Sequence, residues 1–101
     1  MSRVVVTADA DADTNEILRY LEREAGPVVA REYGRRFRVA IERIVALLES
    51  GALRPVLGPN ARVAIVFPYV LLYDYMREDD TVVVLRILHG KRDISSQLLR
   101  R

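Results

Sequence analysis

The sequence has 101 residues, of which 50% are hydrophobic and 30% charged, a composition typical of a single globular domain rather than of a disordered chain. It has no cysteine and one histidine, which excludes disulfides and thiolate metal sites and argues against a zinc centre, so we expect neither a metal nor a cofactor. No apolar run approaches the roughly 20 residues that span a bilayer, and Met1–Thr7 is too short for a signal peptide, so we expect a cytoplasmic protein that does not contact a membrane.

The net charge is only +2, but the sixteen basic residues are unevenly placed. One group consists of Arg31, Arg35, Arg36, Arg38 and Arg43, and the other of Arg86, Lys91, Arg92, Arg100 and Arg101. Each group could be a solvated face or a binding surface for an acidic partner, and the sequence does not decide between the two.

The first elements are a short strand at Arg3–Thr7 and a helix at Ala8–Ala25. Thr7 is placed to cap the helix, because its hydroxyl can accept a hydrogen bond from a backbone N–H two or three residues further on. Three carboxylates follow in the first turns and suit the positive end of the helix dipole: Asp9, Asp11 and Asp13. Their alternation is similar to that of metal ligands, but a calcium loop also needs a glycine and a distal glutamate. Gly26 ends the helix.

A second helix is predicted at Val28–Leu48, where apolar residues recur at spacings of three and four. The Gly26–Pro27 connection is so short that the two helices must form an antiparallel hairpin. Gly34 indicates a close approach between them. We expect five apolar side chains of the hairpin to lie in the core: Ile17, Leu21, Phe37, Ile41 and Ile44.

After a loop at Arg54–Ala61, three strands are predicted at Val63–Phe67, Tyr69–Tyr75 and Thr81–Leu88, with Arg77–Asp80 as a hairpin connection. The segment Ile94–Arg101 could be a helical turn or a tail that orders on a partner. The fold class is therefore α+β, with the order β-α-α-β-β-β and a helical hairpin packed on a small antiparallel sheet. Strict alternation along the last strand puts Val83, Leu85, Ile87 and His89 on one face, and Val82, Val84, Arg86 and Leu88 on the other. A charged guanidinium is rarely buried, so we expect Arg86 to meet water or a ligand.

Possible chemistry centres on His89, which is close in sequence to Arg86, Lys91 and Arg92. A histidine among cations could perform acid–base work on a phosphodiester, but a lone histidine at a strand end is more often structural. Similarly, the tyrosines at 69, 73 and 75 could stack on bases, although this spacing is more often that of core residues. The sequence contains no nucleophile–base motif, so we assign no catalytic residue.

Three segments resemble the RelE/ParE superfamily of bacterial toxins, and within it the ParE branch. "TADADADTNEILRYL" (Thr7–Leu21) is similar to the opening of the family, "FPYVLLY" (Phe67–Tyr73) to its central strand, and "VVVLRILHGKRD" (Val82–Asp93) to its closing strand and turn. Val70 departs from the family, which commonly has arginine after the first tyrosine of the central strand. The resemblance covers nearly the whole chain and implies the toxin half of a type II toxin–antitoxin module.

The resemblance implies different targets in the two branches. RelE-like members are ribosome-dependent mRNA endoribonucleases, whereas ParE-like members poison DNA gyrase and block replication. Where the nuclease branch has a catalytic arginine, this chain has Ile65, and where that branch has a tyrosine, this chain has Leu98. Only Arg92 matches a basic residue of the nuclease branch. The ParE-like reading, a non-enzymatic gyrase inhibitor, is therefore favoured. The alternatives are a RelE-like nuclease using Arg86, His89 and Arg92, or a decayed toxin that only binds antitoxin.

The expected partners are a small acidic antitoxin and gyrase, with the ribosome and its mRNA as the alternative target. The residues expected to contact the target are Arg86, His89, Lys91 and Arg92. Those expected to contact the antitoxin are Leu18, Tyr20, Arg31, Arg35 and Arg38, because basic side chains complement an acidic segment that folds on binding.

Overall fold

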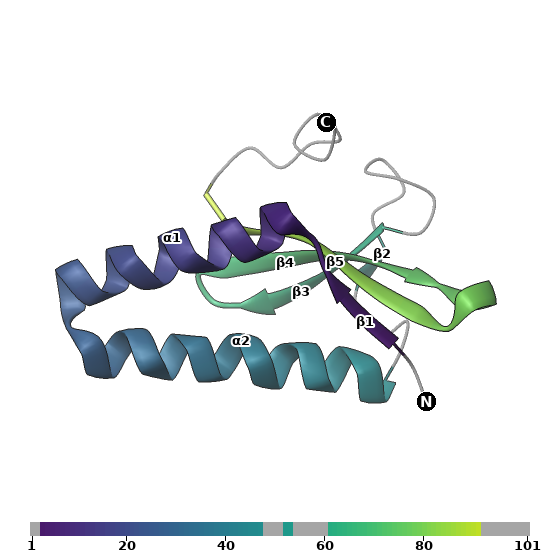
Figure 1. Ribbon diagram of the computed structural model, residues 1–101, viewed down its shortest axis with the longest axis horizontal. Coiled ribbons are helices and arrows are strands. Elements are labelled where there is room, and N and C mark those ends of the chain that lie inside the picture. The colour runs from purple at the N-terminus through teal and green to yellow at the C-terminus, as the bar shows by residue number, and fades with distance from the viewer. Residues whose placement is uncertain (1–2, 48–51, 54–60, 92–101) are drawn as a thin grey trace.

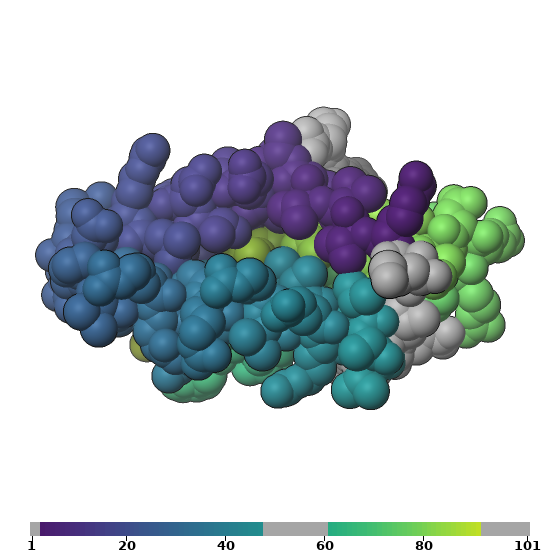
Figure 2. Space-filling view, turned by 60° about the horizontal axis from the view of Figure 1, so that its bottom comes forward, coloured from purple at the N-terminus to yellow at the C-terminus, as the bar shows by residue number. Residues whose placement is uncertain are grey.

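The computed structural model describes residues 3–47, 52–53 and 61–91. In chain order the elements are β1 (Arg3–Val6), α1 (Ala8–Ala25), α2 (Pro27–Leu47), β2 (Ala52–Leu53), β3 (Ala61–Val66), β4 (Tyr69–Met76), a short 3-10 turn (Arg77–Asp79) and β5 (Thr81–His89). The two helices run antiparallel and lie side by side, with the sheet behind them (Figures 1 and 2). The predicted α+β fold, a helical hairpin packed on a mostly antiparallel sheet, is confirmed.

The described residues form a sheet of five strands in the order β1-β5-β4-β3-β2. β3, β4 and β5 form the predicted antiparallel meander, while β1 pairs in parallel with β5 from Arg3–Thr81 to Val6–Val84. β2 was not predicted, because two residues carry too little alternation to indicate a strand. β3 also begins at Ala61, which was assigned to the preceding loop.

Thr7 joins the start of α1 to the sheet. Its Oγ1 accepts the Ala10 N–H at 3.0 Å, which confirms the predicted helix cap. The same hydroxyl donates to the Leu85 carbonyl at 2.9 Å, and the Thr7 N–H donates to the Val84 carbonyl at 3.1 Å. The first turn of α1 is therefore fixed directly on β5.

The turn between the helices is made at Gly26, whose φ of 93° is a conformation that favours glycine. Gly34 faces α1, as predicted, but a Cβ there would meet Leu18 at 3.7 Å, an ordinary contact distance. The position thus shows close packing of the hairpin without requiring glycine.

The core lies between the hairpin and the helix-facing side of the sheet. Its most enclosed members are Ala10, Phe37, Ile44, Tyr69, Leu71, Tyr73, Val82, Val84 and Ile87. Phe37 and Ile44 are buried as predicted, whereas Ile17, Leu21 and Ile41 are only partly buried at the margin of this cluster. Tyr69 and Tyr73 are buried core residues, the more common role of tyrosines at this spacing.

The predicted faces of β5 are wrong, because the strand contains a bulge. Tyr73 pairs with Val84, but the preceding residue of β4, Leu72, pairs with Arg86, so Leu85 is an extra residue on β5. The bulge reverses the alternation. Val82 and Val84 before it therefore share the core face with Ile87 after it.

Within the part of the chain that the structure describes, neither helix is long and apolar enough to cross a membrane.

Candidate functional site

The end of the β4–β5 ladder holds His89 on the surface of the aromatic core. His89 pairs with Tyr69, and the two rings lie edge to face with their centroids 5.6 Å apart. The His89 Nδ1 accepts the Lys91 N–H at 3.1 Å, and the Gly90 N–H donates to the Pro68 carbonyl at 2.7 Å. A Cβ at residue 90 would lie 3.1 Å from that carbonyl oxygen, so the turn favours glycine.

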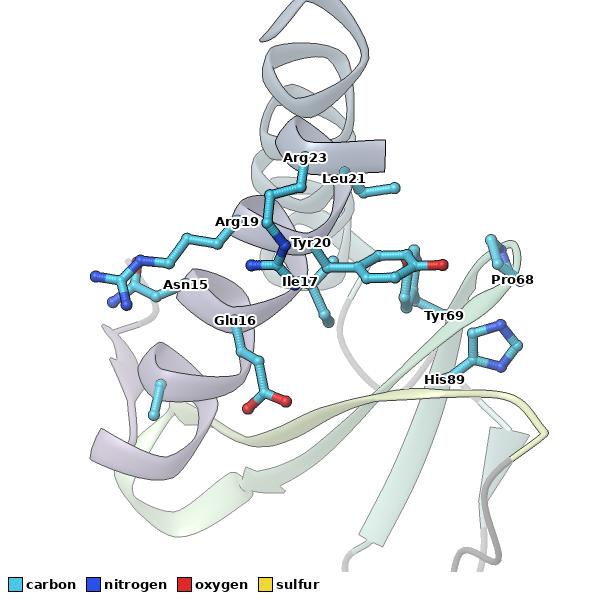
Figure 3. Close-up of a pocket in the computed structure, with 11 residues that line it drawn as sticks. Asn15, Glu16, Ile17, Arg19, Tyr20, Leu21, Arg23, Pro68, Tyr69 and His89 are labelled. Carbon is cyan, nitrogen blue, oxygen red and sulfur yellow. The ribbon is translucent and has the colours of Figure 1, made fainter. Parts of the chain in front are cut away.

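A groove of about 890 Å³ separates this turn from the outer side of α1 (Figure 3). The β3–β4 turn contributes Pro68, and the sheet contributes Tyr69 and His89. The helix contributes mainly Asn15, Glu16, Arg19, Tyr20 and Arg23. The Tyr20 side chain extends from α1 toward the side of the groove where Tyr69, Pro68 and His89 lie, and it remains 51% exposed. The groove thus combines exposed aromatic rings with charges of both signs.

Tyr69 forms the floor of the groove and stays neutral at physiological pH. Burial raises the pKa of its phenol above the usual value, and the nearby Tyr33 and Tyr20 raise this pKa further. Its ring packs edge to face on Tyr33 and Phe37, with centroids 5.7 and 5.6 Å away. Tyr69 is therefore a rigid neutral surface rather than a proton donor or acceptor at neutral pH.

Arg86 is mostly withdrawn from water, contrary to expectation, because it is bound by Asp13 of α1. Its Nε and Nη2 donate to the two carboxylate oxygens at 2.7 and 2.9 Å, and the side chains are only 17% and 13% exposed. Asp13 Oδ2 also accepts the Ile87 N–H at 3.0 Å. The hydrogen bond to Asp13 raises the pKa of Arg86, in spite of its partial burial. Asp13 is therefore a partner of β5 rather than only a helix-starting carboxylate.

Of the four residues expected to contact the target, the structure describes three, and it separates Arg86 from His89 and Lys91. His89 lines the groove, Lys91 is exposed beyond it, and Arg86 is held against α1 and does not line it. Arg92 lies outside the described residues, as does Leu98.

The arginines expected to contact an antitoxin lie on α2. Arg31, Arg35 and Arg38 are exposed and, with Val28, border a shallow depression. Glu32 lies among them and binds Arg35 at 2.7 Å and Arg36 at 3.3 Å. The hydrogen bond from Arg35 contributes most to lowering the pKa of Glu32, which falls to about 2. This part of α2 remains cationic over the physiological pH range.

Leu18 and Tyr20, assigned to the same antitoxin surface, point to different places. Tyr20 is exposed in the groove, whereas Leu18 is partly buried against α2 and the core. Leu18 therefore belongs to the hairpin packing. Glu16, Arg19 and Arg23 share the outer face of α1 with Tyr20 but were not identified from the sequence. Their spacing of three and four residues could have identified them.

Two of the described residues, His89 and Ile65, bear on whether the site could be catalytic. Within the described part of the chain the structure shows no hydrogen bond between His89 and a carboxylate or hydroxyl, so His89 does not belong to a preassembled nucleophile–base pair. Ile65 is an apolar side chain, 64% exposed on β3. It can neither carry a positive charge nor transfer a proton.

The sequence matches the family described as the ParE toxin of type II toxin–antitoxin system, parDE, over residues 4–94. It is 33% identical to Toxin ParE3 of Caulobacter vibrioides over 98 residues, which cover 97% of this chain and 96% of that protein. It is 29% identical to Toxin ParE of Escherichia coli over 109 residues, covering 100% of this chain and 97% of that protein.

Solved structures share the fold. A chain of the chromosomal ParDE TA system from P. aeruginosa superposes with a TM-score of 0.72 at 21% identity, covering 88% of this chain and 96% of that one. The isolated E. coli RelE toxin gives a TM-score of 0.58 at 15% identity, covering 92% of this chain and 88% of that one. The family match spans most of the chain and agrees with the relatives and the fold, so the chain belongs to the ParE toxin family of type II toxin–antitoxin systems.

Proposed function

We propose that this protein is a toxin that inhibits DNA gyrase without cutting RNA and that a cognate antitoxin neutralises it. One observation is the basis for proposing that the protein does not cut RNA: Arg86 donates hydrogen bonds to both carboxylate oxygens of Asp13. A cation that stabilises a developing phosphorane must be free to approach the phosphate. Arg86 could do so only after its ion pair with Asp13 is broken.

Two further features support a binder over a nuclease. Ile65 occupies the position where the nuclease branch keeps an arginine, and it presents only an exposed apolar side chain. Tyr73, which could have stacked on bases, is completely buried and cannot contact RNA. Gyrase as the target is inferred from the ParE branch of the family.

The antitoxin part of the proposal rests on the family and on the surface of α2. The P. aeruginosa relative belongs to a ParDE TA system, and another chain with this fold, 26% identical with a TM-score of 0.58, belongs to the toxin–antitoxin complex RelBE2 of Mycobacterium tuberculosis. Exposed arginines on α2 complement an acidic partner, and such charges mainly speed the encounter. Tyr20 is the exposed aromatic anchor that this partner would cover.

Controlled induction of the protein in cells tests the proposal. Filamentous growth and a DNA-damage response, with intact mRNA by primer extension, are the expected results. The second candidate function, a ribosome-dependent endoribonuclease, is favoured by the exposure of His89 in the same groove as Glu16 and predicts codon-phased cuts instead. A decayed toxin predicts neither response while still co-purifying with the product of the adjacent gene.

A further inference from the structure

Phe67 is the most exposed large apolar side chain among the described residues, with 81% of its surface accessible. It lies with Pro68 in the turn between β3 and β4, and Ile65 of β3 is also 64% exposed. Single apolar side chains on a surface are normal. Tight turns, however, mainly use Gly, Pro, Asn, Asp and Ser, so the turn itself does not explain an aromatic side chain at this tip.

The backbone that carries Phe67 is held from two sides. On one side, the Tyr33 hydroxyl of α2 donates to the Phe67 carbonyl at 3.3 Å. On the other side, the Gly90 N–H donates to the Pro68 carbonyl at 2.7 Å. The next residue, Tyr69, is buried, and its ring packs edge to face on Tyr33. The turn is therefore fixed to both α2 and the end of β5, whereas the Phe67 side chain lies in solvent.

A fixed aromatic side chain is suited to anchor a protein interface. Aromatic residues that fill a pocket on the partner contribute much of the binding free energy at such interfaces. A phenylalanine side chain has only two torsions, and the backbone here is already ordered, so little conformational entropy is lost on binding. Phe67 stands at the convex tip of a turn, so the surface complementary to it is a pocket.

Cations lie beside this apolar tip, on the side of α2. The Arg36 guanidinium stacks over the Tyr33 ring, 5.0 Å from its centroid, and Tyr33 is the residue that holds the Phe67 carbonyl. Arg35 and Arg36 also border a small groove between α2 and β3. Glu32 neutralises only part of this charge, because both arginines share it. A partner that covers Phe67 brings its rim close to these arginines, and carboxylates at that rim would be complementary.

Shape and charge favour a folded protein as this partner. A segment that folds only on binding fills grooves with its own side chains and has no pocket before it binds. A second copy of the chain offers the groove beside Tyr20, but Arg19 and Arg23 line that groove and would lie near the cations around Phe67. A nucleic-acid base can stack on an exposed ring, but the second exposed apolar side chain, Ile65, favours an apolar pocket.

We propose that Phe67 inserts into a preformed apolar pocket of the folded protein that this toxin inhibits, with acidic side chains at the rim of the pocket near Arg36. Ile65 enlarges the apolar contact. The identification of that protein as gyrase rests on the proposed function. The assignment of Phe67 to the target rather than to the antitoxin rests on the shape and charge of the turn.

Inhibition of gyrase tests the role of the side chain. Phe67→Ser is expected to raise the protein concentration that halves supercoiling by about tenfold. The matched control is Leu47→Ser, which removes an apolar side chain that is 59% exposed at the end of α2 and is expected to inhibit as the unaltered protein does. Phe67→Tyr keeps the ring and is expected to lose less inhibition than Phe67→Ser. Circular dichroism establishes that each variant is folded. Equal inhibition by Phe67→Ser and Leu47→Ser would overturn the proposal.

Binding of the adjacent gene product separates the target from the antitoxin. Phe67→Ser is expected to bind this product with the affinity of the unaltered protein, because its loss is confined to the surface that meets the target. A loss of this affinity as large as the loss of inhibition would place Phe67 in the antitoxin surface and would contradict the assignment.

A photoreactive side chain identifies the surface that Phe67 meets. Phe67→p-benzoylphenylalanine is expected to crosslink to gyrase on irradiation, and Leu47→p-benzoylphenylalanine is not. Peptide mapping is expected to place the crosslink in a pocket lined by apolar residues, with Asp or Glu at its rim. Crosslinking of residue 67 to the DNA in the assay, or to a second copy of the chain, would show that the partner class is wrong.

Growth arrest in cells keeps this inference separate from the choice of gyrase as the target. If the unaltered protein inhibits gyrase and Phe67→Ser does so equally, the inference fails while the proposed function stands. If the unaltered protein arrests growth but leaves gyrase active, gyrase is removed from the proposed function. The inference then holds only if Phe67→Ser loses the arrest while Leu47→Ser keeps it. If the unaltered protein does neither, both the inference and the proposed function fail.

Discussion

Asp13 and Arg86 are 73 residues apart in sequence, yet their side chains form a two-fold hydrogen-bonded ion pair between α1 and β5. The same carboxylate accepts the backbone N–H of Ile87, next to the bulge in β5. This pair, together with the Thr7 hydroxyl on Leu85, fixes the first two turns of α1 to the sheet. It therefore also fixes the wall of the groove that carries Tyr20.

Removal of one partner of this ion pair is expected to be costly. Asp13→Ala leaves the mostly enclosed guanidinium of Arg86 without its carboxylate, and we expect a loss of about 2–4 kcal/mol in the free energy of unfolding. Urea denaturation measures the loss, with Asp11→Ala, an exposed acid two residues earlier, as the matched control. The coupling is measured by adding Arg86→Ala to each background. If the two single changes were additive in the double variant, the ion pair would have no energetic role.

Phe37 is the aromatic centre of the contact between α2 and the sheet. It is 3% exposed and packs against Tyr33 and Tyr69. Truncation to alanine is expected to reduce the free energy of unfolding by about 3–5 kcal/mol. Val28→Ala on the same helix, where the side chain is 68% exposed, provides the control in the same denaturation experiment. Similar losses at both positions would show that Phe37 is not central to the core.

Asp74 gives a pH dependence whose direction follows from its environment. Burial among strand neighbours raises its pKa, so folding disfavours the charged form. The resulting penalty is present at neutral pH and disappears as the pH falls through the raised pKa toward the unfolded value of about 3.9. Asp74→Asn should therefore be more stable than the unaltered protein at pH 7, and the gain should vanish in acid. A gain that persists or grows below pH 4 would contradict this explanation.

The two surfaces assigned to the antitoxin are expected to affect different rate constants. Arg35→Glu/Arg38→Glu should slow association and weaken its dependence on salt, because long-range steering is reduced. Tyr20→Ala should instead speed dissociation about tenfold, because it removes an exposed aromatic anchor. Surface plasmon resonance with the adjacent gene product separates the two effects, with Arg3→Glu/Arg77→Glu as the charge control. If Arg35→Glu/Arg38→Glu left the association rate constant unchanged, the partner would bind away from α2.

Helical spacing and capping predicted most of the fold. The stripe that includes Phe37 and Ile44, the Thr7 cap and the short Gly26–Pro27 connection are local features of the sequence. They were sufficient to place the hairpin, whereas the meander was placed by three apolar runs separated by Pro68 and Arg77–Asp80. The parallel pairing of β1 with β5 is a contact between the two ends of the described chain, which no local pattern reports.

The predictions that failed depended on one inserted residue and one distant contact. The extra residue Leu85 reverses the faces of β5, and alternation cannot reveal a bulge. The unusual arginine in an apolar strand did indicate a need for a partner, but the sequence did not identify Asp13 as that partner. The partial burial of Leu18 could not be predicted for a similar reason, because a helix has several faces and only the packing of α2 decides which one is covered.

The central claim, inhibition of gyrase without RNA cleavage, is tested most directly with purified components. The protein is added to gyrase, ATP and plasmid DNA, and supercoiling and trapped DNA cleavage are followed on gels, with and without the product of the adjacent gene. We expect loss of supercoiling and accumulation of cleaved DNA, and we expect the gene product to reverse both effects. Unchanged gyrase activity, together with codon-phased cleavage of mRNA on translating ribosomes, would contradict the claim.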